Sequence, residues 1–241
     1  MGHAMVVGGA PNMTVPVTGI KGSDIAVGSI VKLMEDGVAT DYLVANHGIP
    51  SGSSLYDASC DGMWLLRKEI IEQRVWDAGN SNVLETSDVQ AWLNSDMLAK
   101  YDSAAQSAIK QVKIPYRKNG GMGGSNQSGA NGLSCKAFMP SVIELGIAKL
   151  ENLNGLVDGD VLSYFKTNAE SKVVAYFNGK PATWSTRSPS TQSYVSIFQI
   201  NTRSNFYGVK STNESNGIRP AVIVSSNALF NENTLVLVGV E

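Results

Sequence analysis

Residues 184–224 read WSTRSPSTQSYVSIFQINTRSNFYGVKSTNESNGIRPAVIV. Two short motifs, WSTRSP at 184–189 and GIRPA at 217–221, bracket a segment built mostly of Ser, Thr, Asn, Gln and aromatic residues, in which the charges are Arg203, Lys210 and Glu214. Small polar residues mixed with Tyr and Phe compose binding paratopes, whereas catalytic sites need titratable groups held in pairs. The segment therefore predicts recognition rather than chemistry.

Short apolar runs separated by turn residues surround this stretch and are typical of strands. Upstream, Glu35-Asp36-Gly37 predicts a hairpin turn between two strands. Apolar residues at helical spacing predict two helices, the first capped by Thr86 or Ser87 and the second by a Ser103–Gln106 capping box. The order strands, helices, strands predicts an α+β fold with segregated elements. The expected strands are Ser29–Met34, Asp41–Ala45, Val173–Phe177, Tyr194–Ile200, Phe206–Val209, Ala221–Val224 and Leu235–Val238, and residues 118–132 are expected to form a long loop.

Length and composition place the chain among globular proteins. It has 241 residues, of which 43% are hydrophobic and 17% charged, and a formal net charge of -2. Without a basic excess to neutralise phosphates, nucleic acid is not expected as a partner. No apolar run approaches a membrane span, and no secretion signal is expected. Met1–Met5 are typical of residues left by cloning, so we expect residues 1–22 to be this remnant with a linker arm, and residues 23–241 to form one domain.

Candidate chemical groups are few. The histidines are His3 and His47, and the cysteines are Cys60 and Cys135, none at metal-ligand spacing. Two buried free thiols are favoured over one disulfide, because a chain of this length can build its core without a covalent link. Asp57 with Asp61, or Asp158 with Asp160, could supply calcium ligands, but Asp-Gly pairs more often form turns. The glycine-rich run 119–124 lacks the flanking elements of a phosphate loop. We therefore predict no catalytic residue, no metal and no cofactor.

Arg187 and Arg219 each lie among small residues close to a proline. Buried arginines in such surroundings usually bind backbone carbonyls or a carboxylate and hold loops together. We favour this structural role over ligand binding.

Five short motifs carry a resemblance to known proteins. They are YDASCDGMWLLRK at 56–68, AWLNSDML at 91–98, AIKQVKIPYR at 108–117, WSTRSP at 184–189 and GIRPA at 217–221. In this order, over roughly residues 30–225, they resemble an uncharacterised domain of gut bacteria and their phages. Arg187 followed by Gly217-Ile218-Arg219 also resembles the formylglycine-generating-enzyme branch of the C-type lectin fold, and through it the variable proteins of diversity-generating retroelements. The resemblance implies a C-type-lectin-like fold with short twisted antiparallel sheets, two helices and long loops.

The resemblance further implies a non-catalytic display protein whose ligand-binding face is diversified over residues 185–216. We expect its partner to be a protein or glycan on a cell surface, and its location to be a virion or a bacterial surface. The face is expected to comprise Tyr194, Ser196, Phe198, Asn201, Arg203, Asn205, Phe206, Tyr207, Ser211 and Asn213, and its scaffold Trp184, Arg187, Gly217, Arg219 and Pro220.

Two alternatives stay open. One is an oxidase of the formylglycine-generating type. Members of that type carry their catalytic cysteines between the two arginine motifs, and residues 187–219 contain no cysteine. The other is a purely structural module of a virion or cell surface.

Overall fold

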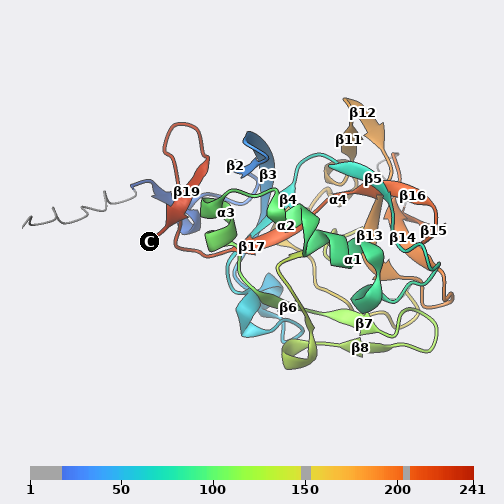
Figure 1. The fold of residues 1–241 in the computed structure, drawn as a ribbon. Helices are drawn as coiled ribbons and strands as arrows, with labels where there is room; N and C mark the ends of the chain where they lie inside the picture. Colours follow the sequence, from blue (N-terminus) through green and yellow to red (C-terminus); the bar gives the residue numbers. More distant parts are fainter. Residues whose placement is uncertain (1–17, 148–152, 203–206) are drawn as a thin grey trace, which may run out of the picture.

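The computed structural model describes residues 18–147, 153–202 and 207–241. Within them strand accounts for 37% and helix for 18%, and the strands form six small sheets. The α+β class of C-type-lectin type that we expected is therefore wrong, because the domain is rich in β-structure (Figure 1). None of the helices in these residues is long and apolar enough to cross a membrane.

The structure contains helices, but they are short, so helix makes up a smaller share of the domain than the predicted α+β class requires. They are α1 (Asp88–Leu93), α2 (Asp96–Ala99), α3 (Ser103–Ala108) and α4 (Ala169–Lys172). Asn94 follows α1, and its side-chain oxygen accepts hydrogen bonds from the backbone N–H groups of residues 136 and 137, 2.8 and 3.2 Å away. The residue that follows α1 is thus tied to a distant loop. The 3₁₀ turns are η1 (Gly22–Asp24), η2 (Pro50–Gly52), η3 (Ala58–Cys60), η4 (Leu84–Thr86), η5 (Gly129–Asn131) and η7 (Ser163–Phe165).

A five-stranded antiparallel sheet forms the centre of the molecule, in the order β10-β17-β4-β3-β2. Its strands are β2 (Ile30–Glu35), β3 (Val38–His47), β4 (Met63–Arg67), β10 (Ala137–Phe138) and β17 (Ala221–Val224). The inner strands β4 and β17 are buried on both faces and have nearly continuous apolar sequences, whereas β2 at the edge alternates between buried and partly buried residues.

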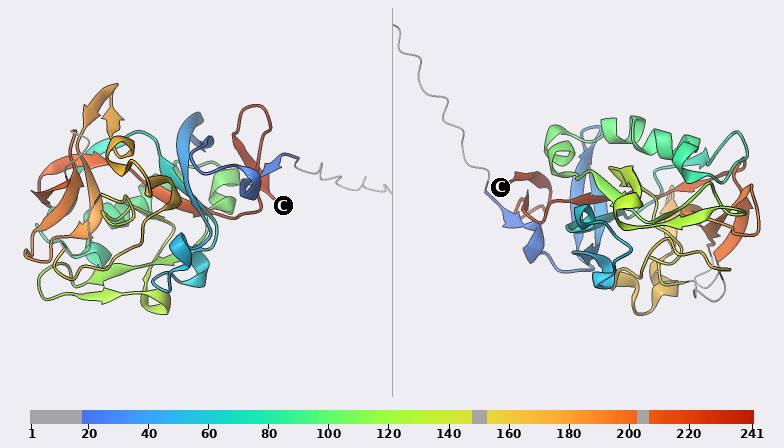
Figure 2. Two further views of the ribbon diagram at one scale, coloured as in Figure 1. Left: turned by 180° about the vertical axis from the view of Figure 1, so that it is seen from behind. Right: turned by 90° about the horizontal axis from the view of Figure 1, so that it is seen from below.

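Side chains of β4 show how the two faces divide the core. Met63 and Leu65 join one apolar cluster, which α1, α2 and α3 cover. Trp64 and Leu66 point to the opposite face and join a second cluster with Phe138. Figure 2 shows the three helices in a row along one side of the molecule. The period of two along the strand therefore assigns alternate residues to different cores.

A second five-stranded sheet, in the order β15-β14-β13-β16-β5, contains most of the stretch 184–224. Its strands are β5 (Glu72–Val75), β13 (Trp184–Pro189), β14 (Ser196–Ile200), β15 (Tyr207–Ser211) and β16 (Ser215–Ile218). The pair β13–β16 is parallel and the others are antiparallel. All six residues of β13 are buried, and β15 lies at the edge. The motif WSTRSP is therefore an interior strand of this sheet.

The remaining strands form one three-stranded sheet, β1-β18-β19, and three hairpin-like pairs, β6–β9, β7–β8 and β11–β12. The three-stranded sheet brings the start of the described chain next to the C-terminus, at the end of the molecule opposite β14 and β15 (Figure 1). Their bounds are β1 (Ile20–Lys21), β18 (Ala228–Phe230), β19 (Leu237–Val240), β6 (Val112–Ile114), β9 (Leu133–Cys135), β7 (Tyr116–Lys118), β8 (Ser125–Gln127), β11 (Ala175–Phe177) and β12 (Lys180–Ala182).

Several local predictions are confirmed. Asp36 and Gly37 both have positive φ, as a tight hairpin turn between β2 and β3 requires. Ser87 caps α1, and Ala221–Val224 is a strand with the expected bounds.

Other local predictions need correction. The cap of α3 is Asp102, whose carboxylate accepts from the N–H of Ala105 at 2.8 Å, and not Ser103. Part of the expected loop at 118–132 pairs as β7 and β8. The expected arm at 1–22 lies largely outside the described residues, and its end pairs with β18.

Candidate functional site

The segment expected to bind ligand comprises β14, β15 and the turns before and after them. Tyr194 lies in the turn between β13 and β14, and its side chain is 63% exposed. Asn213 is exposed in the turn after β15, and Ser196, Asn201 and Ser211 are partly buried. Phe198 is 7% exposed and packs in an apolar cluster, so its side chain does not belong to an exposed face. Tyr207 is described only as backbone of β15, and the predicted contacts Arg203, Asn205 and Phe206 lie outside the described residues.

Asn82, which the sequence did not single out, holds the turn that carries Tyr194. Its side-chain N–H₂ donates to the carbonyls of Ser193 and Ser196 at 2.9 and 2.8 Å. Its backbone N–H donates to the carbonyl of Tyr194 at 2.9 Å. Asn82 is 1% exposed. Asn82, which is buried and lies 112 positions earlier in the sequence, thus holds the backbone of the turn that carries the exposed Tyr194.

The glycine-rich run 119–124 packs against the same turn. The N–H of Gly121 donates to the side-chain oxygen of Asn82 at 3.0 Å, and the N–H of Met122 donates to the carbonyl of Ser193 at 3.1 Å. A Cβ on Gly121 would lie 1.8 Å from the carbonyl oxygen of Ser190, so this position has no room for a side chain. Glycine here permits the close approach of two backbones.

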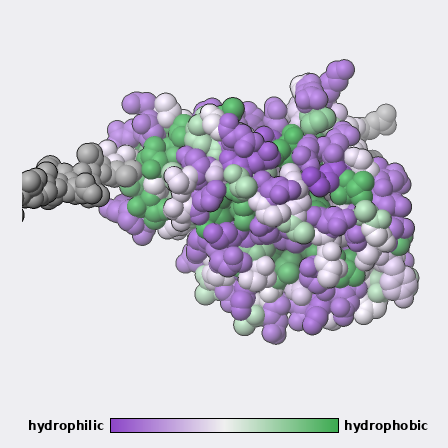
Figure 3. Space-filling view, viewed as in Figure 1, coloured by the Kyte–Doolittle hydropathy of each residue, from purple (hydrophilic) through white to green (hydrophobic). Residues whose placement is uncertain are grey.

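The turn after β15 is also bound to a distant loop. The Ser211 hydroxyl lies 3.0 Å from the side-chain oxygen of Asn80 and 2.9 Å from that of Asn213. The N–H of Thr212 donates to the carbonyl of Val195 at 2.9 Å, which joins the two turns of the segment. On the side of the molecule seen in Figure 3, hydrophilic residues predominate and apolar residues form scattered patches.

Arg187 anchors the start of the segment in a buried network. Its guanidinium forms a two-point ion pair with Glu144, with N–O distances of 2.6 and 2.7 Å, and both side chains are fully buried. Its other N–H groups donate to the carbonyls of Pro115, Met139 and Asp158. All five donors of the guanidinium are therefore used, and the nearby carboxylates hold its pKa above its usual range despite burial.

Arg219 and its neighbours anchor the end of the segment. The Arg219 guanidinium lies 5.1 Å from the ring centroid of Trp184, and its Nε donates to the carbonyl of Arg67 at 2.7 Å. Gly217 lies where a Cβ would be 2.6 Å from the carbonyl of Thr183. Pro220 is buried, and its carbonyl accepts from the N–H of Arg67 at 2.9 Å. The residues expected as scaffold thus lie in the interior at both ends of the segment.

One known protein family matches most of this chain. The profile of a family described as a domain of unknown function (DUF6273) matches residues 61–226, more than half of the chain. The chain belongs to the DUF6273 family. No curated protein and no solved structure matches it. The DUF6273 match runs from the start of β4 past the end of β17, so it includes both arginine motifs and the whole second sheet.

The two cysteines of this DUF6273 protein are free and buried, as predicted. Burial raises the pKa of Cys60 to about 11 and that of Cys135 to about 12. Both are therefore thiols at neutral pH, and the thiolate is the reactive form. Among the described residues, no three His, Cys, Asp or Glu side chains cluster in a way that could hold a metal ion.

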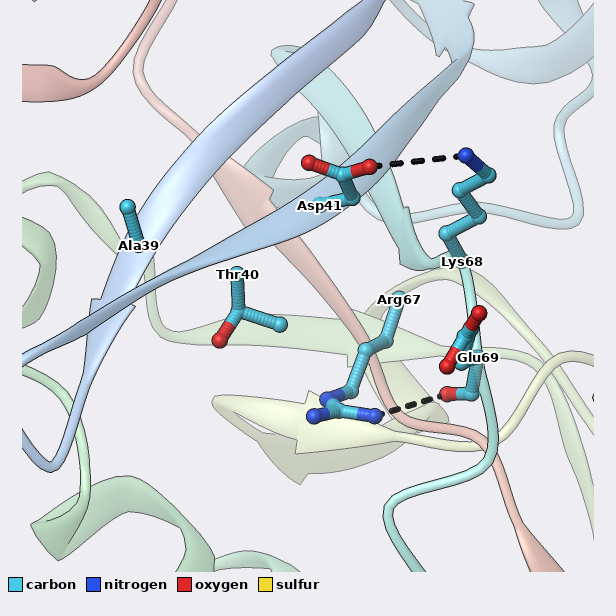
Figure 4. Close-up of a pocket in the computed structure, with 6 residues that line it drawn as sticks. All are labelled: Ala39, Thr40, Asp41, Arg67, Lys68 and Glu69. Carbon is cyan, nitrogen blue, oxygen red and sulfur yellow. Dashed lines mark hydrogen bonds and ion pairs between the residues drawn. The ribbon is translucent and has the colours of Figure 1, made fainter. Parts of the chain in front are cut away.

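A hollow of about 300 Å³ lies beside the hairpin β2–β3, lined by Asp41, Arg67, Lys68 and Glu69 among others. In Figure 4 Lys68 reaches Asp41, at 3.4 Å, and Arg67 donates to the carbonyl of Glu69 at 2.9 Å. Asp41 also pairs with Lys32 at 2.9 Å, and this hydrogen bond lowers the pKa of Asp41. Most charges here are matched by neighbours within the protein, so this hollow offers little to a ligand.

We expect Arg187→Met to lower the free energy of unfolding by about 3–5 kcal/mol, because it leaves Glu144 as an uncompensated buried charge. The matched control is Arg74→Met. Arg74 pairs with Glu72 at 2.6 Å near the surface and lies 4.4 Å from the ring centroid of Trp92, so its loss should change the free energy by at most about 2 kcal/mol. Urea denaturation measures both. Equal small losses would mean that the buried pair does not hold the frame.

Asp158 gives the stability a pH dependence. Burial raises its pKa from 3.8 to about 6, its Oδ2 accepts from the Ser188 hydroxyl at 2.7 Å, and its Oδ1 has no partner among the described residues. A carboxyl whose pKa is higher in the folded state takes up a proton on folding, so its contribution to stability falls as pH rises from about 4 to about 6. The free energy of unfolding of Asp158→Asn, relative to that of the wild type, should therefore be higher at pH 7.5 than at pH 4 by about 1–3 kcal/mol. Denaturation at both pH values measures this difference, and a pH-independent difference would contradict the assignment.

Proposed function

We propose that this DUF6273 protein is a non-catalytic ligand-binding display protein. In this proposal the exposed parts of residues 185–216 bind a protein or glycan on a cell surface, and they vary in sequence as in the variable proteins of diversity-generating retroelements. The protein then acts at a phage tail or a bacterial surface.

The observation that carries the proposal is an exposed tyrosine on a fixed backbone. The Tyr194 side chain is 63% exposed, while its turn accepts three hydrogen bonds from the buried Asn82. A large aromatic side chain loses little conformational entropy on binding, and a rigid turn has little further ordering to undergo. Energetically dominant contacts in interfaces are often of this kind.

The separation between frame and face also supports the proposal. Arg187 and Arg219 hold the two ends of the segment in the interior, and the buried side chains of β14 are Ile197, Phe198 and Ile200. Tyr194 and Asn213 project from the turns. Surface substitutions away from buried features usually change stability little, so the turns can vary in sequence while the fold is retained. Phe198, being buried, is assigned to the frame.

The oxidase alternative receives less support. It needs reactive thiols, and both cysteines are buried with raised pKa values. The purely structural alternative predicts that the protein binds nothing, and the binding experiment below decides it.

We expect Tyr194→Ala to weaken ligand binding by about fivefold to thirtyfold, the effect of removing an interface hot spot, with little change in melting temperature. The labelled protein is tested on glycan arrays and on panels of intact bacterial cells. Val38→Ala is the control, because Val38 is also an exposed apolar side chain, at 65%, but lies on β3. If Val38→Ala weakens binding and Tyr194→Ala does not, the proposed face is wrong. If the wild-type protein binds nothing on either panel, the display proposal fails in favour of a structural module.

A further inference from the structure

A second hollow, of about 230 Å³, lies between the edge of the central sheet and the segment that leads into β11. Its charged and aromatic lining consists of Lys68, Glu69, Tyr164, Lys172, Tyr176 and Arg219. Drug-sized ligands occupy larger pockets, of roughly 300–1,000 Å³. The hollow shares no residue with the face around Tyr194. A ligand in the hollow would therefore be distinct from the ligand of the proposed display face.

Arg219 is the unusual member of this lining. Its side chain is buried, at 3% exposure, yet it forms no ion pair within the described chain. Its Nε donates to the carbonyl of Arg67, and its buried Nη1 has no hydrogen-bond partner among the described residues. Burial, with a smaller contribution from the nearby Arg67, lowers the pKa of Arg219 to about 9, and Tyr164 opposes this shift. The guanidinium also lies 5.1 Å from the ring centroid of Trp184, but no carboxylate pairs with it among the described residues. A buried charge without an ion-pair partner is unfavourable, so this position favours an anion.

Arg187 provides the internal comparison. Both arginines come from the two bracketing motifs and both are buried. Arg187 meets a carboxylate at two points and uses every donor, whereas Arg219 lines a hollow and meets none. The same chain thus satisfies one buried arginine completely and leaves the other incomplete where a small molecule can reach the hollow.

The surroundings of Arg219 also favour an anion. Lys172 donates to the carbonyl of Tyr164 at 2.7 Å, and its Nζ lies 4.5 Å from the ring centroid of Tyr164, with no carboxylate partner in the described residues. Lys68 lies at the exposed rim and is paired with Asp41. Two cationic side chains without a carboxylate partner in the described residues, Lys172 and Arg219, therefore share the hollow with one carboxylate, the exposed Glu69. The rings of Tyr164 and Tyr176 supply flat apolar surface beside these charges.

We propose that this hollow binds a small acidic sugar, with its carboxylate or phosphate group paired to Arg219 and Lys172 and its ring packed against the tyrosines. Guanidinium groups form two-point hydrogen bonds with both kinds of oxyanion. Aromatic side chains pack against the ring.

Isothermal titration and thermal melting of the whole protein test this proposal with four soluble probes: glucuronate, glucose 6-phosphate, inorganic phosphate and glucose. We expect at least one of the two acidic sugars to bind and to raise the melting temperature, and glucose to do neither. The comparison of glucuronate with glucose 6-phosphate decides between carboxylate and phosphate. Binding of inorganic phosphate alone would retain the anion site and remove the sugar from the proposal. Binding should weaken with salt, since part of the attraction is between charges near the surface.

Variants locate the site. Lys172→Gln should weaken binding by about fivefold, and Arg219→Lys by at least about tenfold, because the two-point contact is lost. Lys180→Gln, on the exposed strand β12, is the control with the same charge change and should bind as wild type. Tyr194→Ala should also leave binding unchanged, which separates this site from the display face. If Arg219→Lys does not fold, Lys172→Gln carries the test. Equal binding by Lys172→Gln and Lys180→Gln, or no binding of any acidic probe to the wild type, overturns the proposal.

Discussion

The buried ion pair between Arg187 and Glu144 is the interaction on which the rest of the structure depends. Around one guanidinium it joins Pro115 before β7, Met139 after β10, Glu144 itself and the backbone of Asp158. Tyr56 adds a fifth segment, since its hydroxyl donates to Glu144 at 2.8 Å. These segments are mostly loops, which have few backbone hydrogen bonds of their own. The planar Arg187 guanidinium, with five N–H donors in fixed directions, holds them in one arrangement. The pair is weak evidence for net stability, but it fixes where the strand β13 lies.

Once β13 is fixed, the second sheet follows. Strand β14 pairs with one side of β13 and β16 with the other, and β15 is left at the edge. The turns that project from this sheet are held from below by side chains of the loop before η4, above all Asn82 and Asn80. The exposed residues therefore sit on backbone that is fixed by interactions at their buried side. Such an arrangement suits a surface whose side chains change while its shape is retained.

The sequence predicted well what is decided within a few residues. The hairpin at Asp36-Gly37 depends on two residues that accept positive φ, and the cap of α1 depends on Ser87 alone. The cap of α3 was misplaced by one residue, because Asp102 and Ser103 are both good caps and the register of the helix decides between them. Partners that are far apart in sequence could not be predicted. The buried structural role expected for Arg187 agrees with the structure, but its partner Glu144 lies 43 residues away and was not predicted. Nothing in the local sequence marked Asn82 as the support of the turn that carries Tyr194.

The fold class failed for a related reason. The helical periodicity between residues 86 and 112 predicts helices that the structure contains, but they are short. Helix α1 ends at Leu93, and the next residue, Asn94, is bonded to the loop before β10. Phe198 was expected in the face because aromatic residues in a polar segment suggest contacts, whereas its partners Val142 and Leu156 lie in separate parts of the chain. Which side of β14 is buried could not be read from the strand alone, since the register shift in β13 changes the pairing between Ser185 and Pro189.

The most direct test of a fixed frame with a variable face is the sequence of the encoding locus, with its flanks, across a natural population of the source. Our account predicts that substitutions concentrate in the codons of exposed residues such as Tyr194 and Asn213, arise at adenines, and spare Arg187, Glu144 and Asn82. It also predicts a near-copy of the cassette and a reverse transcriptase gene nearby. If the codons for 185–216 vary no more than those of the helices α1 and α3, diversification of this face is contradicted.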